Sequence, residues 1–185
     1  RFAYCYWAND VVDLDNKPIP DRTGKPLRYY PEEVKMEIID PRFIETAGAR
    51  MKKYEIDKNA TKEGRLMDND IVLFRYADVL LMKAEAYLRN GDQATGQNFF
   101  DNVRARAEMP LRELTFENLL DERLLELCWE GWRRQDLIRF GQYESLFEGD
   151  EWDAKVDESD GHTTVFPIPA DILTLNPNLT QNKGY

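Results

Sequence analysis

Three observations predict an all-α protein with long irregular loops. Apolar residues recur at helical spacing over 71–107 and again over 115–141. Residues 1–67 are rich in Pro, Asp, Tyr and Lys and show no sustained period, apart from a short stretch at 2–7 that could pair as a strand. We therefore predict two regions: a loop-rich segment, 1–67, that packs on a helical core, and a helical region with an extended tail, 68–185.

The first helix is expected at 71–88, where nearly every position is apolar, so that most of its sides should be buried. The three residues before it favour helix N-caps and are Asp68, Asn69 and Asp70. Gly91 and Asp92 are expected to end this helix and start a second one, which Pro110 stops. Two helices joined by a short turn form a hairpin.

This hairpin is similar to one tetratricopeptide repeat (TPR), in which small residues let two helices approach closely. The residues at the corresponding offsets are Leu80, Ala84, Tyr87, Gly91, Gly96, Phe100 and Val103. A single unit cannot cover its own apolar faces, so it should stack on the helices of 115–141 and on repeats upstream. The fold class predicted is therefore all-α, with TPR-like helical hairpins and long irregular loops.

The next helical region, 115–141, is expected to begin at the N-cap Thr115, to bend or break at Gly131 and to end at Gly141. One apolar face is formed by Leu120, Leu124, Leu127 and Cys128. The chain has two cysteines, which allow one disulfide, but the place of Cys128 on this face favours a buried free thiol.

The C-terminal part is expected to be mostly irregular. Residues 144–160 are acidic and should form a solvated loop, and 165–169 contain too much proline for a central strand. One or two helical turns are predicted at 170–175, ended by Asn176 before a proline.

Acids and arginines alternate with the apolar residues of these helices, at spacings that favour ion pairs. The pairs expected within one helical turn are Glu85 with Arg89, Glu126 with Arg123, and Glu130 with Arg133 or Arg134. The predicted structural ion-pair network comprises Arg75, Glu85, Arg104, Arg106, Glu122, Arg123, Glu126, Glu130, Arg133 and Asp136. The alternative is that Glu85, Glu122, Glu126 and Glu130 supply an acid and a base for glycoside hydrolysis, which needs two carboxyls facing one cleft.

Composition argues against several functions. A net charge of −10 repels nucleic-acid phosphates, and no glycine-rich phosphate loop follows a strand. His162 is the only histidine and is expected to be a solvated loop residue, which argues against zinc and Ser-His-Asp sites. We predict a protein that is not an enzyme and has no cofactor. A calcium ion at the acids of 150–160 is the alternative there, although their spacing is not that of an EF-hand.

Aromatic residues in loop-like sequence are the candidate ligand-binding residues, because flat rings stack on the C–H faces of sugars. They are Tyr4, Tyr6, Trp7, Tyr29 and Tyr30. The alternative is that these rings pin the long loop to the helices. Trp129 and Trp132 differ: they are expected on the helix, as core residues or as cation-π partners of Arg133.

Four ordered stretches resemble the SusD/RagB-like family of outer-membrane nutrient-binding lipoproteins. They read ERLLELCWEGWRRQDLIRFG at 122–141, LFRYADVLLMKAEAYLRNGD at 73–92, NVRARA at 102–107 and FPIPADILTLNPNLTQNKGY at 166–185. The resemblance covers 71–185 in order and spacing. Because members are longer, it implies that this chain is the C-terminal part of a larger protein whose export signal and anchor lie elsewhere.

The resemblance also implies a function and a location. It implies a non-enzymatic, cell-surface lipoprotein of the outer membrane of a Bacteroidetes-type bacterium. Such a protein captures an oligosaccharide or another nutrient and works with a SusC-like TonB-dependent transporter. The alternative from the residues alone is a helical-repeat scaffold that binds only protein.

Overall fold

The computed structural model describes residues 1–13, 15–33, 38–41, 43–54, 69–143 and 161–185. Helices dominate these residues, and the strands among them are only two residues long, which confirms the predicted all-α class. The chain divides into two compact units, Arg1–Trp132 and Arg133–Tyr185. Among the described residues, no helix is long and apolar enough to cross a membrane.

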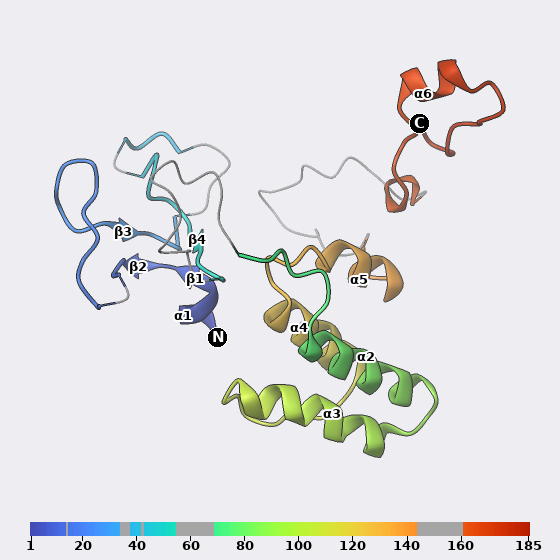
Figure 1. Cartoon of the computed structure of the whole chain (residues 1–185), viewed down its shortest axis with the longest axis horizontal. Coiled ribbons are helices and arrows are strands. Elements are labelled where there is room, and N and C mark those ends of the chain that lie inside the picture. Colours follow the sequence, from blue (N-terminus) through green and yellow to red (C-terminus); the bar gives the residue numbers. More distant parts are fainter. Residues whose placement is uncertain (14, 34–37, 42, 55–68, 144–160) are drawn as a thin grey trace. The chain divides into compact units, whose positions relative to one another are not determined.

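The N-terminal part of the first unit consists of short paired strands and turns (Figure 1). Helix α1, Phe2–Cys5, is a single turn, so only the second half of the stretch predicted as a strand is extended. That half, β1 (Tyr6–Trp7), pairs antiparallel with β4 (Arg50–Met51). Strand β2 (Asn9–Asp10) pairs antiparallel with β3 (Arg28–Tyr29).

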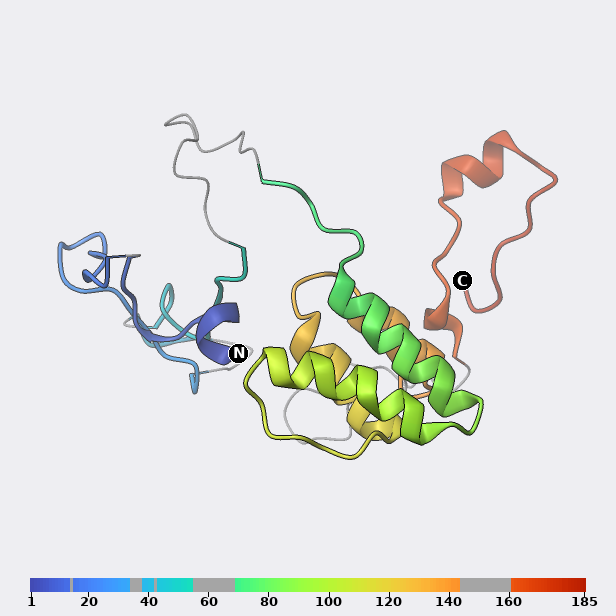
Figure 2. The same cartoon turned by 60° about the horizontal axis from the view of Figure 1, so that its bottom comes forward.

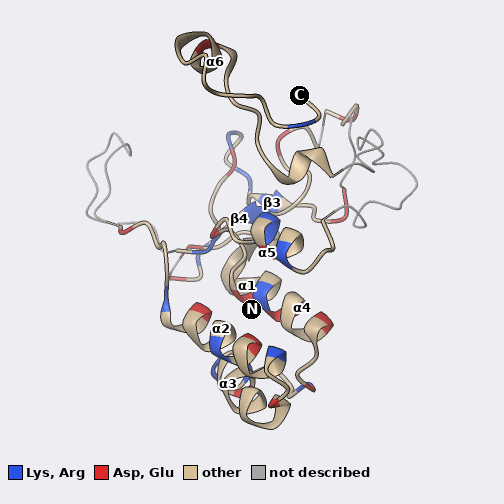
Figure 3. Ribbon diagram, turned by 90° about the vertical axis from the view of Figure 1, so that its right-hand side faces the viewer, with Lys and Arg blue, Asp and Glu red and all other residues tan. Residues whose placement is uncertain are grey.

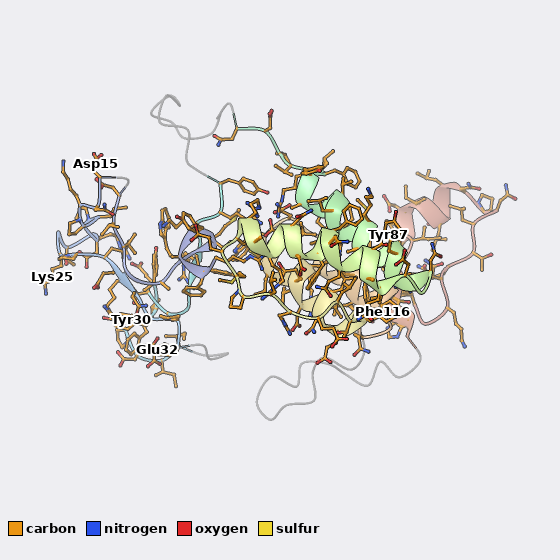
Figure 4. The ribbon with its side chains drawn as sticks, turned by 90° about the horizontal axis from the view of Figure 1, so that it is seen from below. Asp15, Lys25, Tyr30, Glu32, Tyr87 and Phe116 are labelled. Atoms are coloured by element: carbon orange, nitrogen blue, oxygen red, sulfur yellow. The ribbon has the colours of Figure 1, made fainter. Side chains whose placement is uncertain are left out.

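Two similar turns connect β2 to β3. At the start of each, an aspartate, Asp13 or Asp21, accepts through one oxygen the backbone N–H groups two and four residues further along. Asp15 and Lys25, labelled in Figure 4, project from these turns. Val11 is almost fully buried, and its backbone bonds those of Ile19 and Leu27. In these turns, hydrogen bonds from the backbone to aspartate side chains fix the conformation that a helix or sheet fixes elsewhere.

Helix α2, Tyr76–Arg89, begins five residues later than predicted. Arg75, the residue before it, has an extended backbone (φ −142°, ψ 164°), and its guanidinium bonds Glu126 and Glu130. These ion pairs hold the chain extended where its apolar composition favours a helix. The predicted caps Asn69 and Asp70 therefore lie away from the start of the helix. The third predicted cap, Asp68, lies outside the described residues. Expected burial is also wrong at the start, since Ile71, Leu73, Phe74 and Tyr76 are exposed.

Helices α2 and α3 (Gln93–Arg106) form the predicted hairpin and lie side by side in Figures 1 and 2. Gly91, at φ +81°, turns the chain, and Asp92 caps α3 by accepting from the backbone N–H of Thr95 at 3.1 Å. A methyl group added at Gly96 would lie 2.9 Å from the carbonyl oxygen of Ala84 on α2 and 2.8 Å from the Leu114 side chain. The two backbones therefore approach as closely as a glycine permits.

The core of the first unit lies between α2, α3 and α4. Its fully buried apolar residues include Leu81, Ala84, Phe100, Val103, Leu114 and Leu119. At its edge the ring of Tyr87, labelled in Figure 4, stacks on Phe99 with centroids 5.6 Å apart. The Arg89 guanidinium lies over the ring of Phe116, at the start of α4, also labelled there.

Helix α4, Phe116–Glu126, begins at the predicted cap, where the Thr115 hydroxyl accepts from the backbone N–H of Asn118 at 3.1 Å. It ends five residues before Gly131, so the prediction of a helix continuing to that glycine is wrong. Trp129 takes the left-handed conformation at φ +67°, as Gly131 does at φ +79°. Cys128 therefore lies beyond the helix and is partly exposed, which corrects its expected place on a buried stripe.

The second unit contains α5 (Arg133–Arg139), the 3₁₀ turn η1 (His162–Thr164) and α6 (Ala170–Leu175). The helical turns predicted at 170–175 and their end at Asn176 are confirmed. Beyond α6 the chain turns back, and the Gln181 side chain both donates to and accepts from the backbone of Ile168, at 2.9 and 2.8 Å. The acidic loop and candidate calcium ligands of 150–160 lie outside the described residues.

Candidate functional site

Three glutamates four residues apart, on α4 and the turn after it, lie at the centre of the charged cluster. Glu122 is fully buried and pairs with Arg104 of α3 and with Arg1. Glu126 accepts from Arg75 Nη1 at 2.6 Å and also pairs with Arg106. Acidic and basic positions lie together on α2, α3 and α4 (Figure 3). Every carboxylate of this row thus contacts cations from other elements.

Glu130 continues the row beyond the helix end. Its oxygen Oε2 accepts from Arg75 Nε at 2.8 Å, and it also pairs with Lys53. The Lys53 ammonium donates in addition to the carbonyl oxygens of Glu126, at 2.6 Å, and Cys128, at 3.2 Å. The Glu126 carbonyl is at the end of α4 and carries the negative end of its dipole, so Lys53 and Arg75 satisfy it where another helical turn otherwise would.

Burial by itself would raise the pKa of Glu130, but hydrogen bonds from Arg75 and Lys53, together with their charges, outweigh it and lower the pKa. Burial followed by the nearby Glu130 charge raises the pKa of Tyr54 to about 12. A general acid in glycoside hydrolysis needs the opposite, a carboxyl whose pKa is raised. The environment of Glu130 therefore suits a permanent ion pair.

A separate pair joins α2 to α4. Arg123 Nη1 donates to Asp78 Oδ1 at 2.8 Å, and both side chains are almost fully buried. The guanidinium of Arg123 also lies 5.9 Å from the ring centroid of Trp132, which packs against Phe74. Trp132 thus contacts Arg123, whereas the sequence suggested Arg133 as its partner.

The remaining members of the predicted set lie at the margins. Glu85 pairs with Arg89 at 2.8 Å, one helical turn away on α2. Arg133 and Asp136 belong to α5, in the second unit, where Asp136 is buried and pairs with Arg139 at 2.9 Å. The structure thus groups seven predicted residues around α4: Arg75, Arg104, Arg106, Glu122, Arg123, Glu126 and Glu130.

Sequence reasoning missed three charged partners in this cluster: Arg1, Lys53 and Asp78. Arg1 and Lys53 lie in loop-like sequence more than 70 residues from their partners, where no helical spacing points to them. Asp78 could have been found, because an acid within a continuous apolar stretch needs a buried cation.

Four of the candidate aromatic residues lie on the short strands and on α1, and Tyr30 directly follows β3. Tyr6 stacks on Phe2 with centroids 5.1 Å apart, and its other contact is Trp129 at 5.8 Å. Trp7 stands opposite Arg50 in the β1–β4 pair, and the Arg50 guanidinium lies 5.0 Å from the Tyr29 ring. The structure thereby connects the two small sheets through one arginine.

These rings differ in how freely a ligand could reach them. Tyr30 packs edge-on against Phe43 and has the Arg28 guanidinium 5.6 Å from its centroid, so it anchors its loop. Tyr4 is 81% exposed, and Phe2 is also exposed. Trp129, expected on a helix, is half exposed on the turn after α4. Within this group of neighbouring rings, Phe2, Tyr4 and Trp129 are the exposed members.

His162 is half-buried in the second unit, which corrects the expected solvated histidine. Its ring packs edge-on against Tyr185 with centroids 5.1 Å apart, and Gly184 lies against it so closely that a Cβ there would clash. Over the described residues, no group of three or more His, Cys, Asp or Glu side chains could hold a metal ion.

The fold and these contacts define a helical protein whose interior is cross-linked by arginine–carboxylate pairs and which exposes aromatic rings on α1 and on the turn after α4. The chain belongs to the SusD family, whose model matches residues 2–185. It is 33% identical over 141 residues to the starch-binding protein SusD of Bacteroides thetaiotaomicron, an alignment covering 74% of this chain and 25% of that protein.

Two SusD-like proteins of Formosa agariphila are similar as well. One is 30% identical over 132 residues, covering 64% of this chain and 25% of the relative. The other is 33% identical over 150 residues, covering 72% and 28%. The chain thus spans about a quarter of the length of the curated relatives that it matches.

Proposed function

We propose that this chain is part of a non-enzymatic, cell-surface protein that binds an oligosaccharide nutrient. One observation carries the proposal: the chain belongs to the SusD family, and a relative that is 33% identical to it is named a starch-binding protein. The first unit contributes the scaffold, and the rings on its loops contribute to the binding surface. We propose that a SusC-like TonB-dependent transporter at a Bacteroidetes-type outer membrane receives the cargo.

The proposed ligand-binding residues are Tyr4, Tyr6, Trp7, Tyr29 and Tyr30. Tyr4 is the most accessible of them, and an exposed ring costs little to cover with a sugar face. Paired carboxylates in the scaffold support a binding role over a hydrolytic one, because Glu130 is held as an anion by Arg75 and Lys53. The α2–α3 hairpin is proposed to be a TPR-like unit, which fits its close approach at Gly96.

The test is a titration of the protein with maltoheptaose, a starch fragment, followed by tryptophan fluorescence and calorimetry. Cellohexaose serves as the comparison sugar, and a longer protein that includes the sequence upstream is titrated in parallel. Saturable binding of either sugar supports the proposal. Tyr4→Ala should weaken binding by about five- to 150-fold if the ring stacks on a sugar, by analogy with the 1–3 kcal/mol of other aromatic stacking contacts.

Tyr76→Ala is the matched control, because Tyr76 is a similarly exposed tyrosine on α2. It should leave the affinity unchanged. Loss of binding in both variants would mean that the tyrosines act through the fold. Equal affinity in wild type and Tyr4→Ala would remove Tyr4 from the binding surface while leaving sugar binding itself in place.

A second candidate function, a scaffold that binds only protein, is favoured by one observation. The segment that leads into α2 exposes the apolar side chains of Ile71, Leu73 and Phe74. Contiguous exposed apolar residues mark surfaces that another polypeptide covers. The sugar titration separates the two functions. If the protein is a scaffold that binds only protein, the longer protein should show no fluorescence or calorimetric response to any oligosaccharide.

A further inference from the structure

The two cysteines of the chain, 5 and 128, both lie in the first unit although 122 residues separate them in sequence. Cys5 is the last residue of α1 and is buried. Its carbonyl oxygen accepts from the backbone N–H groups of Lys52, at 2.9 Å, and Lys53, at 3.3 Å. This places the N-terminal turn against the two residues that follow β4.

The same lysine also holds Cys128. The Lys53 ammonium donates to the carbonyl oxygen of Cys128 at 3.2 Å, so the backbone of one residue contacts Cys5 and its side chain contacts Cys128. The next residues in sequence, Tyr6 and Trp129, pack ring against ring at 5.8 Å. The lysine and the rings thus give two separate contacts between the two backbone segments.

We propose that Cys5 and Cys128 form an intramolecular disulfide when the protein meets a disulfide oxidant such as oxidised glutathione or the disulfide of a thiol oxidoreductase. The thiolate of Cys128, which is partly exposed, attacks the oxidant and releases one thiolate from it. The Cys5 thiolate then attacks the Cys128 sulfur of this mixed disulfide and releases the second. Two protein thiols lose two electrons and two protons, and the oxidant becomes two thiols.

Such a bond would join α1 to the turn after α4, close to the ion pair between Arg1 and Glu122. The segment it fixes carries the rings of Tyr4, Tyr6 and Trp7. This inference goes beyond the proposed function and does not depend on it. It suits an oxidising compartment, where disulfides form and persist.

The surroundings of Cys128 set the rate. Burial, followed by the neighbouring Cys5, raises the pKa of the Cys128 thiol to about 11. The charge of Glu130 also raises this pKa, whereas the charge of Lys53 lowers it. Because the thiolate is the nucleophile, bond formation should be slow at neutral pH and become faster up to about pH 11. Burial, followed by the nearby Cys128, raises the pKa of the Tyr6 hydroxyl.

The folded protein is equilibrated in buffers of reduced and oxidised glutathione. Free thiols are then trapped with a maleimide, and the products are identified by mass spectrometry. The same equilibration in guanidinium chloride gives the unfolded reference. We expect the protein to lose two electrons and to carry no attached glutathione. The effective concentration of the two thiols toward one another should be at least about tenfold higher in the folded protein than in the unfolded chain, which lowers the reduction potential of the disulfide by about 30 mV.

The matched control moves one thiol. In Cys128→Ser/Glu117→Cys the second cysteine stands on the exposed first turn of α4, about 15 Å along the helix from its end, with a similar length of chain between the cysteines. In this variant the effective concentration of the two thiols should be the same in the folded protein and in the unfolded chain. Products that carry glutathione at each cysteine, or equal effective concentrations for folded and unfolded wild type, would overturn the inference.

Discussion

Arg123 and Asp78 form an ion pair inside the first unit, with Nη1 and Oδ1 2.8 Å apart and side chains 2% and 1% exposed. The pair links α4 to α2 across 45 residues of sequence. Burying two charges costs much of what their attraction returns, so such a pair adds little net stability but is costly to break. It therefore fixes how the two helices meet.

Arg123→Met should lower the free energy of unfolding by about 3–5 kcal/mol, because Asp78 is left buried without its cation. Urea unfolding followed by circular dichroism measures the change. The double variant Arg123→Met/Asp78→Leu should recover much of the loss. Arg106→Met is the control, since Arg106 pairs with Glu126 from an exposed position and should cost at most about 1 kcal/mol. Equal losses for Arg123→Met and Arg106→Met would contradict this account.

Stability should depend on Glu130 in a way that varies with pH. Its pKa is lower in the folded protein than in the unfolded chain, so its contribution is fully present above about pH 4.3, the ordinary value, and is lost as pH falls below it. Glu130→Gln should therefore be less stable than wild type at pH 7, by about 1.5–3 kcal/mol, with the difference shrinking towards pH 3. Urea unfolding of both proteins over that range measures it. A difference that stays constant across the range would show that the charge of Glu130 has no part.

Gly96→Ala should destabilise the hairpin by about 1–3 kcal/mol. Its methyl group would meet the Ala84 carbonyl at 2.9 Å and the Leu114 side chain at 2.8 Å, and the backbone oxygen cannot move without shifting α2. Asn98→Ala, on the exposed side of α3, is the control and should change little. Thermal unfolding of the three proteins measures the effect. A stabilised Gly96→Ala would mean that helix propensity outweighs the close approach.

Gln181→Ala should open the tail without unfolding the first unit. The variant loses both hydrogen bonds to the Ile168 backbone, so the amide of Ile168 should exchange with deuterium faster. Asn178→Ala, which removes an exposed side chain from the same segment, should leave that exchange unchanged. Mass spectrometry after hydrogen exchange measures deuterium uptake in both compact units in the same experiment. Unchanged protection of Ile168 would mean that other tail contacts suffice.

Local chemistry could be predicted well from the sequence. The caps Asp92 and Thr115, the turn at Gly91 and the short helix before Asn176 all appear where they were expected. Each depends on residues within one helical turn, so the pattern contains all the information needed. Helix ends governed by distant residues could not be predicted: Arg75 stays extended and α4 stops at Glu126 because each meets a partner more than 50 residues away.

Periodicity and composition specify the helical class, the hairpin and the abundance of arginines and acids around α4, because these features follow from neighbours along the chain. Which charges pair, that Lys53 contacts both cysteine segments, and that Tyr4 is exposed while Tyr30 is packed depend on how the chain folds. An ion pair or a ring contact requires nearness in space, which loops of unconstrained length do not encode in any spacing along the chain.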